Sequence, residues 1–334
     1  MVTRKGTVLL MAKPFFPWMG NKEKLVPYIH QLIPPHVKQF TEVFGGSGAV
    51  ILGLQPKKGR LDIYNDLNDD LFNVFCCVKE KSFSLAKELK FLPVHGRTPF
   101  AFYRDMAAHE PDFYRHIEEE KRVVAESTCF TEEEIRELLT ILDGNAKLFD
   151  VRRAAAFLFT TYGSFSGTGN SVGIKTVDPQ AIVDKLPQVS RRLDSIFLEH
   201  QDALVLIPKE DRPDGIIYAD PPYMLTEKVY DVRFLPEHHI ILHDRARSCK
   251  GYVIISYGYD DRIIDLYKDD FFIISLKRTN PLSQTEGSTF RELIITNYDP
   301  SPYLNKQLDI FGQASDAMWE PVILNRPHRI LKVD

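Results

Sequence analysis

One stretch of five residues includes side chains that can hold a flat, amine-bearing ring. An apolar run at residues 215–218 is followed by Ala219, Asp220, Pro221, Pro222 and Tyr223. The Asp220 carboxylate accepts hydrogen bonds, and the two prolines lack N–H groups, which leaves nearby backbone carbonyls to accept from a ligand. Tyr223 adds an aromatic face for stacking. This pattern predicts a ring bound through its exocyclic amine; the alternative is an ordinary Pro-Pro turn that ends a strand.

A glycine turn earlier in the chain is a second candidate contact. The predicted strand 39–44 ends in Phe44 and leads into Gly45, Gly46, Ser47 and Gly48. Glycines at a strand-to-helix turn let the backbone approach a ligand closely and aim helix N–H groups at it. The spacing differs from the dinucleotide-binding G-x-G-x-x-G, so NAD is not indicated.

Asp66 follows the next predicted strand, residues 60–64. Its distance from the glycines is the one at which nucleotide-binding α/β units place an acid for ribose hydroxyls. The alternative is the N-cap of the following helix, and one side chain can do both. Near the N-terminus, a turn at Gly20 runs into a helical start that carries Lys22, with Trp18 beside it, and this segment can line a charged ligand. The alternative there is a hydrophobic anchor beside a solvated lysine.

The elements that position these residues alternate between strands and helices, which predicts an α/β fold. The predicted strands are residues 39–44, 60–64, 196–199, 215–218, 251–256, 271–276 and 292–296. The last two read as a hairpin-like pair in a sheet of about seven strands. Because ligands of open α/β sheets bind at the carboxyl ends of the strands, the candidate residues are expected to meet at that edge.

Between residues 80 and 195 helical periodicity replaces this alternation, which predicts an inserted helical lobe. Its acidic runs read as solvated helix faces. A Gly-, Ser- and Asn-rich loop at residues 162–171 suits contact with a sugar-phosphate strand or an extruded base, and equally a plain flexible loop. One further helix is predicted for residues 178–193.

Composition narrows the functional classes. The 334 residues include 44% hydrophobic residues, and the formal net charge is −4. No apolar stretch approaches the roughly 18 residues that a membrane span needs. The four cysteines fit neither a disulfide framework nor a zinc site, so we expect a reducing cytoplasm and no metal. The net negative charge argues against a strongly basic surface for nucleic acid, so we expect any such contact to be local.

The order of these motifs resembles the D12-type (α-group) N6-adenine-specific DNA methyltransferases, over about residues 14–298. The resemblance rests on residues 17–22, 44–48, 66–68, the helical insert and Asp220–Tyr223. It implies a Rossmann-like methyltransferase sheet, with catalytic segments 14–80 and 196–300, a helical target-recognition insert at 81–195 and a tail at 301–334. The implied reaction transfers a methyl group from S-adenosylmethionine to N6 of a flipped-out adenine in a short specific sequence of double-stranded DNA.

The resemblance also implies roles for residues. The implied catalytic residues are Asp220, Pro221, Pro222 and Tyr223. Asp66 would hold the cofactor's ribose hydroxyls, and Asp202 would hold its adenine amine. The full implied cofactor set is Trp18, Gly20, Lys22, Phe44, Gly45, Gly46, Ser47, Gly48, Asp66 and Asp202. Two acids at strand ends and a glycine turn also suit a nucleoside that carries a sulfonium and no phosphates.

Two other functions remain open at this point. One is an RNA adenine-N6 methyltransferase, and the other is a catalytically silent nucleic-acid-binding module; the intact Asp220–Tyr223 turn and Asp66 argue against the silent module. In the tail, Gln307–Phe311 looks like a peptide that docks onto a replicative sliding clamp. The alternative, which we favour, is a tail strand that packs on its own domain.

Overall fold

The computed structural model describes residues 11–91, 118–119, 121–148, 150–164, 178–223, 234–279, 289–304 and 320–327. The chain forms two compact units. The first, called here the helical unit, comprises Met1–Asn21 and Asn68–Leu198, and the second, the sheet unit, comprises Lys22–Leu67 and Glu199–Asp334. The predicted division at residues 81 and 195 stays a prediction.

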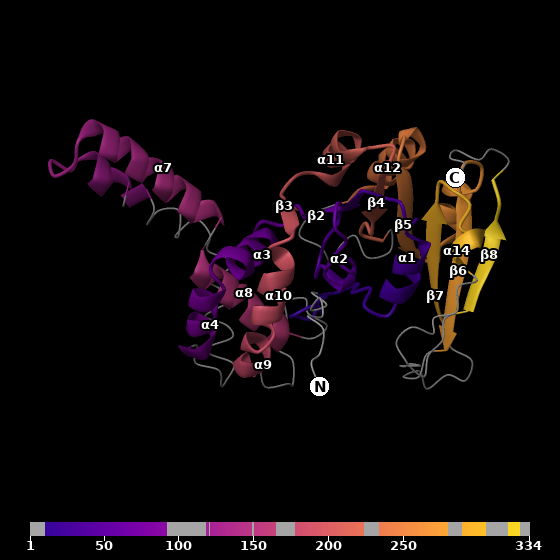
Figure 1. The fold of residues 1–334 in the computed structure, drawn as a ribbon, viewed down its shortest axis with the longest axis horizontal. Helices are drawn as coiled ribbons and strands as arrows, with labels where there is room; N and C mark the ends of the chain where they lie inside the picture. Colours follow the sequence, from indigo (N-terminus) through magenta and orange to yellow (C-terminus); the bar gives the residue numbers. More distant parts are fainter. Residues whose placement is uncertain are drawn as a thin grey trace, which may run out of the picture. The chain divides into compact units, whose positions relative to one another are not determined.

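Within the described residues, one eight-stranded sheet has the order β3-β2-β1-β4-β5-β7-β6-β8 (Figure 1). In the middle of the sheet, the consecutive strands β2, β1, β4 and β5 run parallel to one another, so their carboxyl ends meet at one edge. β7 lies antiparallel between β5 and β6. The strands are β1 Gln39–Glu42, β2 Leu61–Asn65, β3 Ile196–Glu199, β4 Gly215–Ala219, β5 Tyr252–Gly258, β6 Phe272–Thr279, β7 Thr289–Thr296 and β8 Glu320–Asn325.

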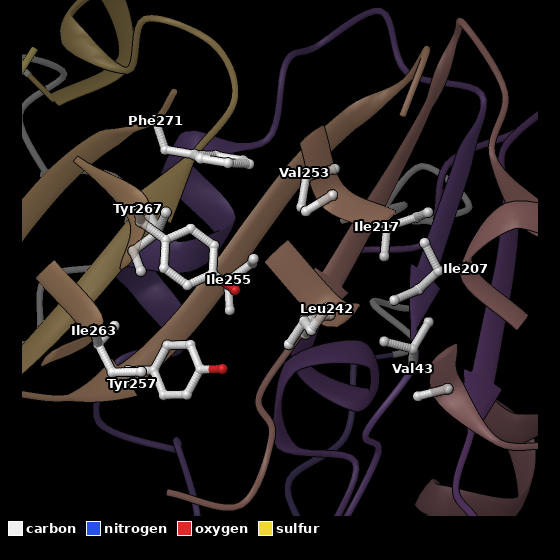
Figure 2. Close-up of a cluster of buried hydrophobic side chains, with 14 of the residues drawn as sticks. Val43, Ile207, Ile217, Leu242, Val253, Ile255, Tyr257, Ile263, Tyr267 and Phe271 are labelled. Atoms are coloured by element: carbon white, nitrogen blue, oxygen red, sulfur yellow. The ribbon is translucent and has the colours of Figure 1, made fainter. Parts of the chain in front are cut away.

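One face of the sheet is covered by α11 (Ala203–Glu210), α12 (Pro236–Ser248) and α13 (Asp261–Tyr267). Side chains alternate along a strand, so Ile217 of β4 and Ile255 of β5 point to this face. They pack with Ile207 of α11, Leu242 of α12 and Ile263 of α13 in a buried cluster (Figure 2). This core fixes the ends of β4 and β5, where the candidate residues lie.

The opposite face carries α1 (Val26–Leu32), α2 (Ala49–Gly53) and α14 (Ser301–Leu304). The Tyr298 hydroxyl donates to the Leu32 carbonyl at 2.6 Å, and the Tyr298 ring meets the Tyr252 ring of β5 edge-on. His30 of α1 bonds the Val50 carbonyl of α2 through Nε2 at 2.8 Å. Helix α1 is thereby held against the sheet unit, and the residues that precede it, including Lys22, are held with it.

The helical unit contains α3 (Asp69–Glu80), α4 (Ser82–Phe91), α7 (Glu132–Leu148), α8 (Val151–Gly163), α9 (Pro179–Val183) and α10 (Leu186–Leu193). Asp150 caps α8 and exchanges two hydrogen bonds with Asn73 of α3, each at 2.9 Å. The prediction of one helix over 178–193 is wrong. Pro187 lacks an N–H and would clash with the carbonyl of Val183, so the chain ends one helix and starts another.

The tail contains β8, which pairs antiparallel with β6 and makes the sheet one strand larger than expected. Gln307–Phe311 lie outside the described residues, as do most of the loop at 162–171 and residues 224–233 and 280–288. None of the described helices is long and apolar enough to cross a membrane. The described His, Cys, Asp and Glu side chains form no group of three or more that could hold a metal ion.

Candidate active site

Asp220 stands at the carboxyl end of β4 with both carboxylate oxygens engaged. The strand is buried along its whole length, and Pro221 and Pro222 end it because neither can donate to a neighbouring strand. Lys22 Nζ lies 2.8 Å from Asp220 Oδ2. On the adjacent strand β5, Ser256 Oγ donates to Asp220 Oδ1 at 2.8 Å. The orientation of the Asp220 carboxylate is therefore set from two sides.

Opposing effects act on the pKa of the Asp220 carboxyl. Burial raises the pKa of the Asp220 carboxyl, while the Lys22 ammonium and the hydrogen bond from Ser256 lower it. The Ser256 hydroxyl also lies 2.8 Å from the Tyr218 hydroxyl, whose pKa burial raises well above its ordinary value. Tyr218 is therefore a neutral phenol, and it steadies the serine that holds Asp220.

Tyr223 is the aromatic residue beside this carboxylate. Its ring lies tilted against that of Tyr257, with centroids 6.1 Å apart, and Lys22 Nζ sits 4.9 Å from its centroid. The Tyr223 hydroxyl donates to Glu292 Oε2 at 2.9 Å. Burial raises the pKa of Tyr223 well above its ordinary value, so the phenol keeps its proton. The ring is thus an uncharged platform next to an anchored acid.

Glu292 of β7 is a site residue that the sequence analysis did not identify. Burial, with a smaller contribution from Asp220, raises the pKa of its carboxyl to about 7, against the opposing effects of Lys22 and Tyr223. It reaches Tyr223 only because β7 inserts beside β5, a pairing of distant segments. No local pattern around Glu292 indicates that pairing.

The predicted glycine turn is built by close backbone contacts. The N–H of Gly48 donates to the Gly45 carbonyl, and the N–H of Gly45 donates to the Asn65 carbonyl, both at 2.8 Å. A Cβ at Gly45 would lie 2.2 Å from the Tyr64 ring, so only glycine fits there. Gly46 and Gly48 have φ of 50° and 66°, the left-handed region that favours glycine.

Asp66 is bound to this turn and does not cap a helix. Its Oδ2 accepts from the N–H of Gly46 at 2.8 Å. The N-cap of α3 is Asn68, whose side chain accepts from Leu71 N, so the N-cap alternative for Asp66 is wrong. The structure brings the two predicted cofactor elements, the glycine turn and Asp66, into direct contact.

Asp202 is brought to the same edge through Asn65, a buried residue that the sequence analysis did not single out. Asn65 Nδ2 donates to the carbonyls of Val43 at 2.8 Å and Gln201 at 3.0 Å, and its Oδ1 accepts from Gln201 N at 2.9 Å. These bonds tie the ends of β1 and β2 to the residue just before Asp202. Asp202 is exposed and caps α11 by accepting from Leu204 N.

The edge is rich in acids. Glu42, at the end of β1, is buried, accepts from Ile51 N at 3.0 Å, and has a pKa raised by burial and by the charges of Asp220 and Asp66. The carboxyls at this edge thus belong to Glu42, Asp66, Asp220 and Glu292, and the ammonium of Lys22 lies among them. Such an edge favours a cationic ligand.

The remaining predicted residues fall into two groups. Phe44 is half-buried and meets Phe234 edge-on, with ring centroids 5.4 Å apart, in the sheet unit. Trp18 and Gly20 belong to the helical unit, where the Trp18 ring lies 5.9 Å from that of Phe157 and Gly20 has a φ of 75°. Their assignment to the cofactor stays a prediction.

The sheet carries a glycine turn, a loop acid and an Asp-Pro-Pro-Tyr turn at the carboxyl ends of its strands. This is the arrangement of a Rossmann-like methyltransferase. The family model described as D12 class N6 adenine-specific DNA methyltransferase matches residues 18–281. The chain belongs to this family and is an adenine-specific DNA methyltransferase.

Individual relatives agree. The chain is 26% identical over 309 residues to the Type II methyltransferase M1.LlaDCHI of Lactococcus lactis subsp. cremoris, covering 86% of this chain and 95% of that protein. It is 23% identical over 317 residues to the Type II methyltransferase M.MjaIII of Methanocaldococcus jannaschii, covering 86% and 99%. The crystal structure of protein LPL1258 from Legionella pneumophila gives a TM-score of 0.21 at 14% identity, over 52% of this chain and 65% of that one, and adds nothing to the argument.

Proposed function

We propose that the protein transfers a methyl group from S-adenosylmethionine to N6 of an adenine turned out of duplex DNA at a short specific sequence. The observation that carries this proposal is the Asp220 carboxylate, held by Lys22 and Ser256 next to the Tyr223 ring. Membership of the family gives the reaction, adenine methylation of DNA. The proposal adds the donor, the extruded base and the residues that act.

The residues of the sheet unit fit this donor. Gly45 has no room for a Cβ, and Gly46 and Gly48 take left-handed backbone angles, as a turn that closely follows a ligand requires. Asp66 is proposed to accept from the ribose hydroxyls and Asp202 from the adenine amine of the donor. The further proposed contacts are Trp18, Gly20, Lys22, Phe44 and Ser47. When bound, S-adenosylmethionine supplies an electrophilic methyl group on a cationic sulfur, which suits the acid-rich edge.

At the target base, Asp220 and the Pro221 carbonyl accept hydrogen bonds from the N6 amine and orient its lone pair. Turning the base out of the stack costs a few kcal/mol, and stacking on Tyr223, roughly 1–3 kcal/mol, offsets part of that. A bound donor would supply its methyl group to this oriented lone pair and keep the electron pair of the broken carbon–sulfur bond. The surplus N6 proton would pass to the Asp220 carboxylate that accepts its hydrogen bond, which leaves the product amine neutral. The enzyme gains rate through orientation and electrostatics.

The partners follow from the same reading. Both relatives are Type II methyltransferases, and we propose that this chain likewise modifies DNA in a cytoplasmic restriction–modification system. Residues 81–195 are proposed to recognise the target sequence. The comparisons give no support to a sliding clamp as a partner, so that role of Gln307–Phe311 stays a sequence-based prediction.

The test is transfer of label from S-adenosylmethionine to unmethylated duplex DNA, with structured RNA in parallel and nucleosides separated afterwards. Label in N6-methyladenine of DNA is expected, and its loss in Asp220→Ala would assign the chemistry to this turn. Glu237→Gln, a change at an exposed residue on α12, serves as the matched control. Label in RNA alone would overturn the proposal in favour of an RNA enzyme. Donor binding without turnover on either substrate would favour the silent module.

A further inference from the structure

One rung of the β5–β7 ladder contacts Tyr223 at two places. Gly258 and Glu292 are directly paired in that antiparallel ladder. Glu292 Oε2 accepts from the Tyr223 hydroxyl at 2.9 Å, at the far end of the side chain. Gly258 lies against the ring itself, since a Cβ at this position would be 2.9 Å from Tyr223 Cδ2 and 3.0 Å from Cε2.

Tyr257 and Lys22 also lie against the Tyr223 ring. The Tyr257 ring lies tilted beside it, and Tyr257 is in turn fixed by a 2.8 Å hydrogen bond between its hydroxyl and His239 Nδ1. Lys22 Nζ stands 4.9 Å from the ring centroid. Burial lowers the pKa of His239 to about 4, so this histidine is neutral at pH 7 and the support beneath the ring carries no charge.

We infer that Glu292 and Gly258 position the Tyr223 ring for the target adenine, with Glu292 holding the hydroxyl and Gly258 allowing the ring to lie close to β5. This inference rests on the proposed function, in which Tyr223 stacks on the base. A tyrosine side chain has two rotatable bonds, and a fixed hydroxyl removes most of its freedom before the base arrives. A platform displaced by about 1 Å can cost about 100-fold in rate, so its placement matters for chemistry. Glu292 is a positioning residue that acts through Tyr223.

The ionisation of Glu292 makes the positioning of the Tyr223 ring depend on pH. The charged and titratable groups that act on its carboxyl are Lys22, Asp220 and Tyr223. With a pKa of about 7, the carboxyl ionises in the range where the enzyme would work. An ionised carboxylate accepts a stronger hydrogen bond than a neutral acid, so the ring is held most firmly above that pKa. The catalytic efficiency on DNA is expected to rise through this range.

The experiment is a double-mutant cycle with Glu292→Ala and Tyr223→Phe, measuring kcat and KM for unmethylated plasmid DNA. Each single variant is expected to lose about tenfold or more in kcat/KM, the scale of a buried hydrogen bond to a charged group. The double variant should lose no more than the worse single variant. Losses that multiply in the double variant would overturn the inference, because Glu292 would then act independently of Tyr223.

Two further variants separate positioning from a merely structural role. Glu292→Gln keeps an acceptor oxygen and should recover part of the loss, with a pH profile that lacks the rise near 7. Gly258→Ala should reproduce the loss with Glu292 intact, because the added methyl group displaces the ring. An unchanged pH profile in Glu292→Gln, or full activity in Gly258→Ala, would count against the inference.

Failure of the proposed function is distinguishable from failure of this inference. If the wild-type protein forms no N6-methyladenine in DNA, the proposed function fails. The same four proteins, wild-type, Glu292→Ala, Tyr223→Phe and the double variant, still test the contact through their unfolding in urea. Coupled losses of stability are expected, and strictly additive losses would overturn the positioning contact itself.

Discussion

Lys22 and Asp220 form a largely buried ion pair, with Nζ 2.8 Å from Oδ2, although the whole second segment of the helical unit lies between them in the sequence. Lys22 is 7% exposed and also stands over the Tyr223 ring. One ammonium group therefore compensates the charge of Asp220, which is proposed to bind the amine, and stands against the ring on which the base is proposed to stack.

Replacing Lys22 by Met should destabilise the protein and impair catalysis. Removing one partner of a buried pair leaves an uncompensated charge, at a cost of about 3 kcal/mol. The pKa of Asp220 should rise further, because Lys22 opposes the effect of burial. Urea unfolding at pH 7 and kcat on DNA measure the two effects. Lys22→Arg keeps the charge and should lose less; equal stability of Lys22→Met and wild type would refute the prediction.

Gly45→Ala should weaken donor binding and stability. Its Cβ would overlap the Tyr64 ring at 2.2 Å, and overpacking of this kind costs about 1–3 kcal/mol. The Tyr64 hydroxyl also donates to the Gly46 carbonyl, so a displaced Tyr64 disturbs the whole turn. Calorimetric titration with S-adenosylmethionine reads the affinity. Gly59→Ala, with φ of 81° and open space around its Cβ, carries backbone strain alone and should keep that affinity.

Asn65→Ala should loosen the edge without touching any proposed catalytic residue. It removes three hydrogen bonds and leaves backbone groups of Val43 and Gln201 without their partner. The expected loss of stability is about 3 kcal/mol, the cost of leaving buried polar groups unsatisfied. Donor affinity should fall with it, because Asp66 and Asp202 lose their fixed separation. A variant as stable as wild type, with unchanged affinity, would show that Asn65 does not organise this edge.

Glu292→Gln should change how stability depends on pH. The pKa of Glu292 is about 7 in the folded protein rather than its ordinary 4.5, so between these values the folded state holds a proton that the unfolded state has lost. Stability from this group is complete below pH 4.5 and is lost as the pH rises to about 7. The stability of wild type minus that of Glu292→Gln should therefore fall across this window and level off above it. Parallel curves for the two proteins would contradict the assigned pKa.

Local patterns predicted much of the fold and part of the site. β3 has the predicted bounds, and β4 ends at the predicted turn, because a short apolar run closed by prolines indicates both a strand and its end. The glycine turn and Asp66 were likewise identified by type and spacing, and the structure joins them. The α/β class and the antiparallel pair of β6 and β7 are confirmed.

What the sequence did not reveal depends on pairings between remote segments. The role of Glu292 depends on the pairing of β7 with β5. The role of Asn65 depends on the contact of the loop before Asp202 with the end of β2. The pair of Lys22 with Asp220 has the same origin. β8 was missed because its short run lies in a tail whose sheet partner, β6, is distant in sequence.

The division of the chain has a consequence for how such proteins diversify. Lys22, the glycine turn, Asp66, Asp220, Tyr223 and Glu292 all belong to the sheet unit, which is built from the segments on either side of residues 68–198. The intervening segment can therefore be regarded as a cassette whose sequence can drift or be exchanged while those contacts persist. Because residues 81–195 are proposed to recognise the target, a laboratory swap of this cassette between relatives, keeping Lys22–Leu67 and Glu199 onward, is expected to change the sequence preference and keep the chemistry.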